Sequence, residues 1–89
     1  MSYRSKILRA MVLLEEAMED LADSISKTRE EIDRAERMIE CVNRKHLDAM
    51  KELLNRKEDL YWTIEEALTK ILEKLAHLEK GVVVKGEGG

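Results

Sequence analysis

Apolar residues recur along almost the whole chain in alternating steps of four and three. This repeat of seven is typical of amphipathic helices that pack along a shared seam. Where its two registers meet, a step of four replaces the expected three, which a change of helix explains. The seam positions are Ile7, Met11, Leu14, Met18, Leu21, Ile25, Thr28, Ile32, Ala35, Ile39, Val42 and His46, then Met50, Leu54, Lys57, Tyr61, Ile64, Leu68, Ile71, Leu75, Leu78 and Val82.

Polar residues interrupt the seam at three positions, Thr28, His46 and Lys57. Two of these lie beside helix-start signals. Thr28 is followed three residues later by Glu31, and Asn55 by Glu58. In such a capping box the first side chain accepts from a backbone amide of the first turn, and the glutamate reaches back to the cap. The stretch "DSISKTREEID" is therefore predicted to hold a turn, with Thr28 as the N-cap of the following helix.

We accordingly predict an all-α fold, an antiparallel three-helix bundle with helices over about 3–25, 29–54 and 56–80. Gly81 stands where a left-handed helix cap is favoured. Residues 81–89, "GVVVKGEGG", are predicted to form a flexible tail.

Two other architectures fit the same pattern. A long helical hairpin turning at "VNRKHLD", residues 42–48, makes the break between the registers the turn itself. Such a hairpin has to dimerise into a four-helix bundle to bury its faces. The third possibility is one straight helical rod, with no turn in the chain.

Apolar residues beside the seam suggest an interaction surface. Residues such as Leu53 and Leu60 occupy positions beside the seam that are charged in a two-stranded coiled coil. The segment 7–14, "ILRAMVLL", is apolar on nearly every side. In the three-helix bundle it lies level with residues 53–64, so one end of the bundle has an excess of apolar surface. The predicted interface residues are Leu8, Val12, Leu13, Tyr61 and Trp62.

Charge and composition narrow the class of protein. The 89 residues include 16 basic and 19 acidic ones, without the basic excess of a nucleic-acid binder. No apolar stretch reaches the length of a membrane span. The lone Cys41 is typical of a reducing, cytoplasmic location. Two asparagines and no glutamine indicate a heat-adapted, thermophile source, because side-chain amides are thermolabile.

Acidic residues offer the main hint of chemistry. Glu15, Glu19 and Asp23 form a stripe at steps of four that a cation or a basic partner would compensate. In "EEAME" and "EEID", Glu16 with Glu19 and Glu30 with Asp33 resemble the ExxE and ExxD pairs of the all-helical MazG-type nucleotide pyrophosphatases. That resemblance implies magnesium binding by these four carboxylates.

The predicted function is that of a non-enzymatic helical interaction or scaffold module that acts through apolar helix faces. Its expected partner is a second copy of the chain or another protein. We expect the chain to have no membrane association, cofactor, metal site or catalytic residue. Two alternatives are the magnesium-dependent pyrophosphatase and a small RNA-binding helical dimer. The RNA alternative rests on "NRK" at 43–45 and at 55–57, with Tyr61 and Trp62 nearby.

Overall fold

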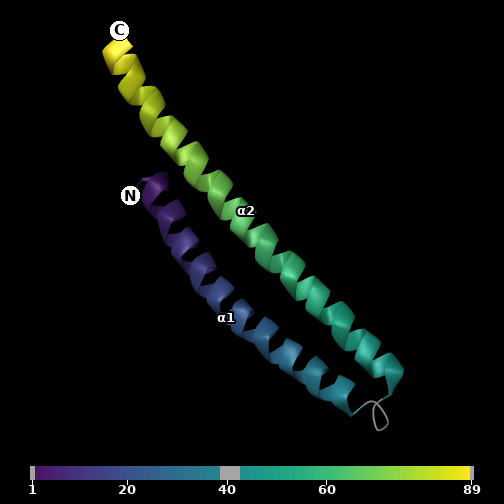
Figure 1. Cartoon of the computed structure of the whole chain (residues 1–89). Helices are drawn as coiled ribbons and strands as arrows, with labels where there is room; N and C mark the ends of the chain where they lie inside the picture. Colours follow the sequence, from purple (N-terminus) through teal and green to yellow (C-terminus); the bar gives the residue numbers. More distant parts are fainter. Residues whose placement is uncertain (1, 39–42, 89) are drawn as a thin grey trace.

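The chain forms a long antiparallel hairpin of two helices (Figure 1). A computed structural model describes the backbone of residues 2–38 and 43–88 and the side chains of that part up to Leu78. Helix α1 spans Tyr3–Arg37 and helix α2 spans Arg44–Gly88. The hairpin measures 73 × 23 × 15 Å, and both ends of the chain lie at the end away from the turn. Its radius of gyration is 20.5 Å, compared with about 12 Å for a compact domain of this length.

Both ends of α1 have ordinary capping chemistry. The Ser2 hydroxyl accepts a hydrogen bond from the backbone N–H of Ser5 at 3.5 Å. At the other end, the N–H of Met38 donates to the carbonyl of Arg34 at 3.2 Å. Arg34 and Arg37 lie in the last turn, where positive charge is favoured by the helix dipole.

Helix α2 begins at an asparagine cap. The Asn43 side-chain oxygen accepts from the backbone N–H of Lys45 at 2.8 Å, and its carbonyl accepts from the N–H of Leu47 at 3.1 Å. Asparagine is among the best N-cap residues, because its side chain satisfies an amide that has no partner within the helix. The chain turns between Arg37 and Arg44, earlier than the hairpin alternative places the turn, because residues 44–48 of "VNRKHLD" already belong to α2. Val42 lies outside the described residues.

The predicted seam is confirmed on both helices. Every seam position of α1 from Ile7 to Ala35 is buried or half-buried, and so is every one of α2 from Met50 to Leu75. His46 is exposed and Leu47 is buried, so Leu47 replaces His46 in the seam and the second register begins three residues before Met50. The buried apolar residues of the described part are Met11, Ile25, Ile32, Leu47, Leu68 and Leu75.

The three-helix bundle is not what forms. Residues 20–35 are continuous helix, so Thr28 is no N-cap, and Asn55 lies inside α2. A cap contributes only about 1 kcal/mol, and a helix that runs on keeps its backbone hydrogen bonds as well as the seam. Helix α2 also continues through Gly81, where its end was expected. No side chain after Leu78 is described, so the flexibility of 81–89 stays a prediction.

Candidate interaction surface

The two polar seam residues inside the helices meet each other across the hairpin. The Lys57 ammonium donates to the Thr28 hydroxyl at 2.9 Å and to the Ser24 hydroxyl at 2.8 Å. Thr28 itself donates to the Ser24 carbonyl at 2.9 Å. Thr28 is 6% exposed, and no buried side-chain nitrogen or oxygen of the described residues lacks a partner. We call Ser24, Thr28 and Lys57 the polar cluster.

The meeting of Thr28 and Lys57 follows from where the chain turns. Thr28 lies 15 residues before Asn43 and Lys57 lies 14 residues after it, so an antiparallel hairpin brings them level. The sequence-based prediction misses this meeting of Thr28 and Lys57, because it places each of them at or beside the start of a helix. The sequence signal for it is that two polar seam residues lie at similar separations before and after Asn43, a residue suited to begin a helix.

Interhelix ion pairs lie on one side of the polar cluster. Arg29 pairs with Glu58, and Glu36 pairs with Lys51 at 3.0 Å. Each of the four residues directly follows a seam residue in the sequence, and the two residues on each helix are seven positions apart. All four therefore project from the same flank of the hairpin. Ala22 and Trp62 belong to the same side, because they lie seven before Arg29 and four after Glu58. We call this the Trp62 side.

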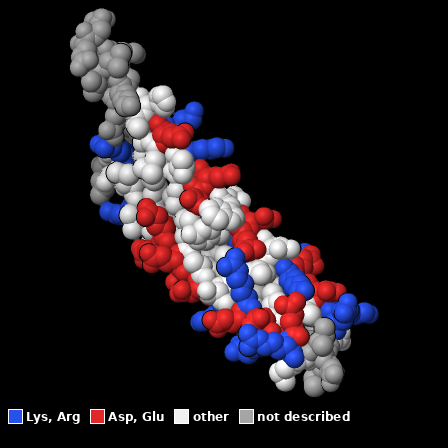
Figure 2. Space-filling model, in the orientation of Figure 1, with Lys and Arg blue, Asp and Glu red and all other residues white. Residues whose placement is uncertain are grey.

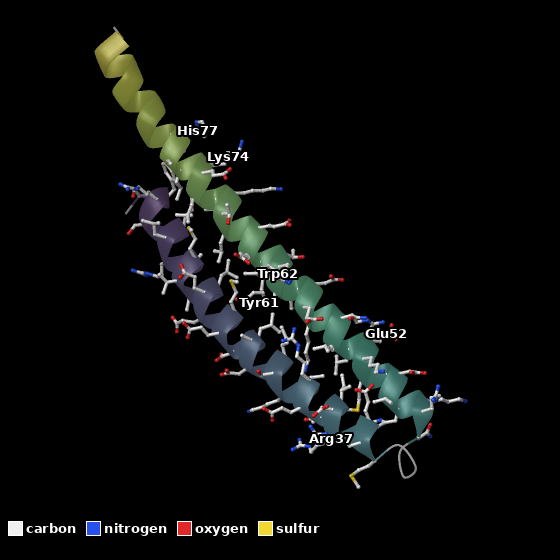
Figure 3. The ribbon with its side chains drawn as sticks, viewed as in Figure 1. Arg37, Glu52, Tyr61, Trp62, Lys74 and His77 are labelled. Carbon is white, nitrogen blue, oxygen red and sulfur yellow. The ribbon has the colours of Figure 1, made fainter. Side chains whose placement is uncertain are left out.

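A shallow hollow of about 360 Å³ opens on the Trp62 side. Its aromatic wall is Tyr61 and Trp62, whose rings meet edge to face with centroids 5.2 Å apart. Tyr61 is half-buried, whereas Trp62 is 59% exposed; both lie midway along the hairpin in Figure 3. The hollow is lined by Ala22, Ile25, Ser26, Arg29, Glu58, Tyr61 and Trp62.

The positions of the opposite flank that adjoin the seam are mostly uncharged. Successive residues of a helix are about 100° apart, so Leu60 projects from the side of α2 opposite Trp62. Leu53 and Leu60 are 47% and 51% exposed, and no ion pair joins the helices on this flank in the described residues. We call this the Leu60 side. Its inner positions are Ala10, Ala17, Ser24, Glu31, Leu53, Leu60, Ala67 and Lys74.

The predicted interface residues do not form one patch. Leu8, Val12, Leu13 and Trp62 are all exposed, and Tyr61 is half-buried in the seam. Segment 7–14 lies level with about residues 68–78, because Met11 packs against Leu68 and Leu75 and Ile7 shares a hollow with Leu78. It does not lie level with 53–64, as the three-helix bundle required. The apolar surface is instead distributed along the length of the hairpin.

The four carboxylates of the pyrophosphatase resemblance lie on one helix. Glu16 and Glu30 are 14 residues apart in α1, a distance of about 21 Å along its axis. A single magnesium ion takes ligands at about 2.1 Å, so both pairs of one chain cannot hold it together. Among the described residues, no group of three or more His, Cys, Asp or Glu side chains is placed to hold a metal ion.

The basic triplets differ in exposure. Arg44 and Lys45 are exposed in the first turn of α2. In the second triplet, Lys57 belongs to the polar cluster, and Arg56 pairs with Glu52 at 2.7 Å. On the face drawn in Figure 2, acidic and basic residues both border an uncharged strip along the hairpin. The second triplet therefore offers little positive charge to a phosphate backbone.

The comparisons with known proteins add no identity. The chain matches no family model, no curated protein and no solved structure. Within residues 2–38 and 43–88, no helix combines the length and apolar character needed to cross a membrane. The functional interpretation therefore depends on the hairpin's own surfaces.

Proposed function

We propose that the chain is a non-enzymatic interaction module that self-associates through exposed faces of its helical hairpin. The observation that carries this proposal is the set of large apolar side chains left exposed along the hairpin, all but Leu78 of them outside the seam. These exposed side chains are Tyr3, Leu8, Val12, Leu13, Met38, Leu53, Leu60, Trp62, Leu72 and Leu78.

The total surface supports the same proposal. The chain exposes 7345 Å², whereas a compact monomer of 10.3 kDa exposes about 5,400 Å². The difference of about 1,900 Å² is comparable with what one chain buries in an obligate assembly. A lone two-helix hairpin also has no third layer to cover the flanks of its seam.

Light scattering coupled to size-exclusion chromatography tests self-association. We expect a mass that is a multiple of 10.3 kDa and that rises with protein concentration. A mass of one chain at every concentration up to the millimolar range would contradict the proposal. Small-angle scattering on the same samples then relates the mass to the 73 Å length of the hairpin.

A further inference from the structure

The two sides of the hairpin carry opposite charge. On the Leu60 side, the inner positions and those neighbours three or four residues away that lie outside the seam include six basic and two acidic residues. A hollow of about 300 Å³ places Lys70 and Lys74 of this side beside Tyr3. The charged residues of the Leu60 side are Lys6, Asp20, Lys27, Glu31, Arg34, Arg56, Lys70 and Lys74.

The Trp62 side has the reverse balance. By the same spacing, the residues whose side chains are described include seven acidic and three basic ones on this side. Two of the three basic residues, Arg29 and Lys51, are already paired within the hairpin. The charged residues of the Trp62 side are Glu15, Glu19, Arg29, Asp33, Glu36, Arg44, Asp48, Lys51, Glu58 and Glu65.

This asymmetry selects between two ways of pairing identical chains. A two-fold contact places each side against itself, so like charges oppose each other on either side of the hairpin. A head-to-tail contact places the basic Leu60 side of one chain against the acidic Trp62 side of the next. We propose that the chain binds a second copy of itself in this head-to-tail manner, an inference that rests on the self-association proposed above.

Shape favours the same contact. Leu60 and Tyr61 are adjacent in α2, so Leu60 and the hollow lie at the same height on opposite sides of the hairpin. Two hairpins side by side thus bring the exposed Leu60 of one to the hollow of the other. The small Ala22 leaves room in that hollow, and the exposed Trp62 provides its apolar wall.

A head-to-tail contact has a structural consequence. Each pair retains an unused Leu60 side on one chain and an unused Trp62 side on the other, so further copies add until a ring closes or a filament grows. Salt weakens the contact, because opposite charges attract across it. A two-fold contact between like-charged sides is strengthened by salt instead.

Two complementary variants test the proposal. Leu53→Glu with Leu60→Glu places acid on the Leu60 side, and Ala22→Lys with Trp62→Lys places base on the Trp62 side. Neither pair alters a buried seam residue, and circular dichroism verifies that each variant stays helical. The matched charge-reversal control is Arg9→Glu with Glu16→Lys, at exposed residues on neither side.

We expect each variant alone to have the 10.3 kDa mass of one chain, and an equimolar mixture to have twice that mass. The mixture assembles because it retains one intact Leu60 side and one intact Trp62 side. The control assembles like the parent chain. A mixture that stays monomeric, or a variant that remains assembled alone, overturns the head-to-tail contact but leaves self-association standing. A parent chain that is monomeric throughout overturns self-association itself.

Discussion

The seam is built differently near the open end of the hairpin and nearer its turn. Towards the open end, Met11, Leu68 and Leu75 form an apolar cluster. Nearer the turn, the Lys57 ammonium crosses the seam to the hydroxyls of Ser24 and Thr28. Apolar contacts tolerate several alignments of two helices, whereas the half-buried Lys57 ammonium needs its acceptors at one alignment. The apolar part thus mainly stabilises the hairpin, and the polar cluster mainly aligns it.

That alignment also matters for the outer surfaces. Because Thr28 and Lys57 lie at the same height along the hairpin, Ala22 lies beside Tyr61 and Trp62. This alignment therefore decides where the hollow forms.

Removing a buried leucine from the apolar cluster should have the largest effect. Leu68→Ala is expected to lower the free energy of unfolding by about 2–4 kcal/mol, through lost burial and the cavity left behind. Urea unfolding followed by circular dichroism measures this change. The control Leu72→Ala changes an exposed leucine and should alter stability by less than about 0.5 kcal/mol. Equal effects of the two would show that the apolar cluster is not the main source of stability.

Removing the Thr28 hydroxyl should have the next largest effect. Thr28→Val takes away one acceptor of the Lys57 ammonium inside the seam and is expected to cost about 1–3 kcal/mol. Thr63→Val is a close control, because the Thr63 hydroxyl makes the same bond to a carbonyl four residues earlier, at 2.8 Å, but is exposed. If the two substitutions cost the same, the interhelix bond contributes nothing.

Making the polar cluster apolar should separate alignment from stability. Thr28→Leu with Lys57→Leu is expected to raise the free energy of unfolding by about 1 kcal/mol, since apolar groups replace a buried hydroxyl and a half-buried charge. The helices should then sample more than one alignment. The amide spectrum from nuclear magnetic resonance checks this, with extra resonances expected for α2 residues near position 57. A single set of resonances would contradict the aligning role of the cluster.

The exposed ion pair beside the cluster should contribute less. Arg29→Gln is expected to lower stability by at most about 1 kcal/mol, because Arg29 is mostly exposed and water screens the pair. The loss should shrink as salt is added. A loss larger than that of Thr28→Val would reverse the order of importance given to the ion pair and the cluster.

Magnesium should have the smallest effect. The Glu16 and Glu19 pair lies on α1 about 21 Å from the Glu30 and Asp33 pair, so we expect millimolar magnesium to leave the thermal midpoint unchanged. Differential scanning calorimetry measures the midpoint. The same titration of Glu16→Gln with Glu19→Gln is the control. A magnesium-dependent rise that this variant abolishes would restore the pyrophosphatase alternative.

Much of the local structure can be predicted from the repeat of apolar residues. Positions such as Met11, Ile25, Ile32 and Leu68 are predicted to be in the seam and are buried there, because burial of one helix face follows directly from its spacing. Exposure of flanking leucines such as Leu53 is less predictable, since it depends on how many helices the fold contains. A third helix would have covered them.

The turn and the contacts that follow from it depend on the folded chain. Thr28, Asn43 and Asn55 are all suitable caps, and each offers only about 1 kcal/mol, so local chemistry ranks them poorly. The hairpin turns before Asn43. This position of the turn pairs the two seams along their length and brings Lys57 to its two hydroxyl acceptors. Capping is a local energy, whereas seam pairing adds up over the length of both helices. The repeat therefore predicts which residues face inward, and the position of the turn settles which of them meet.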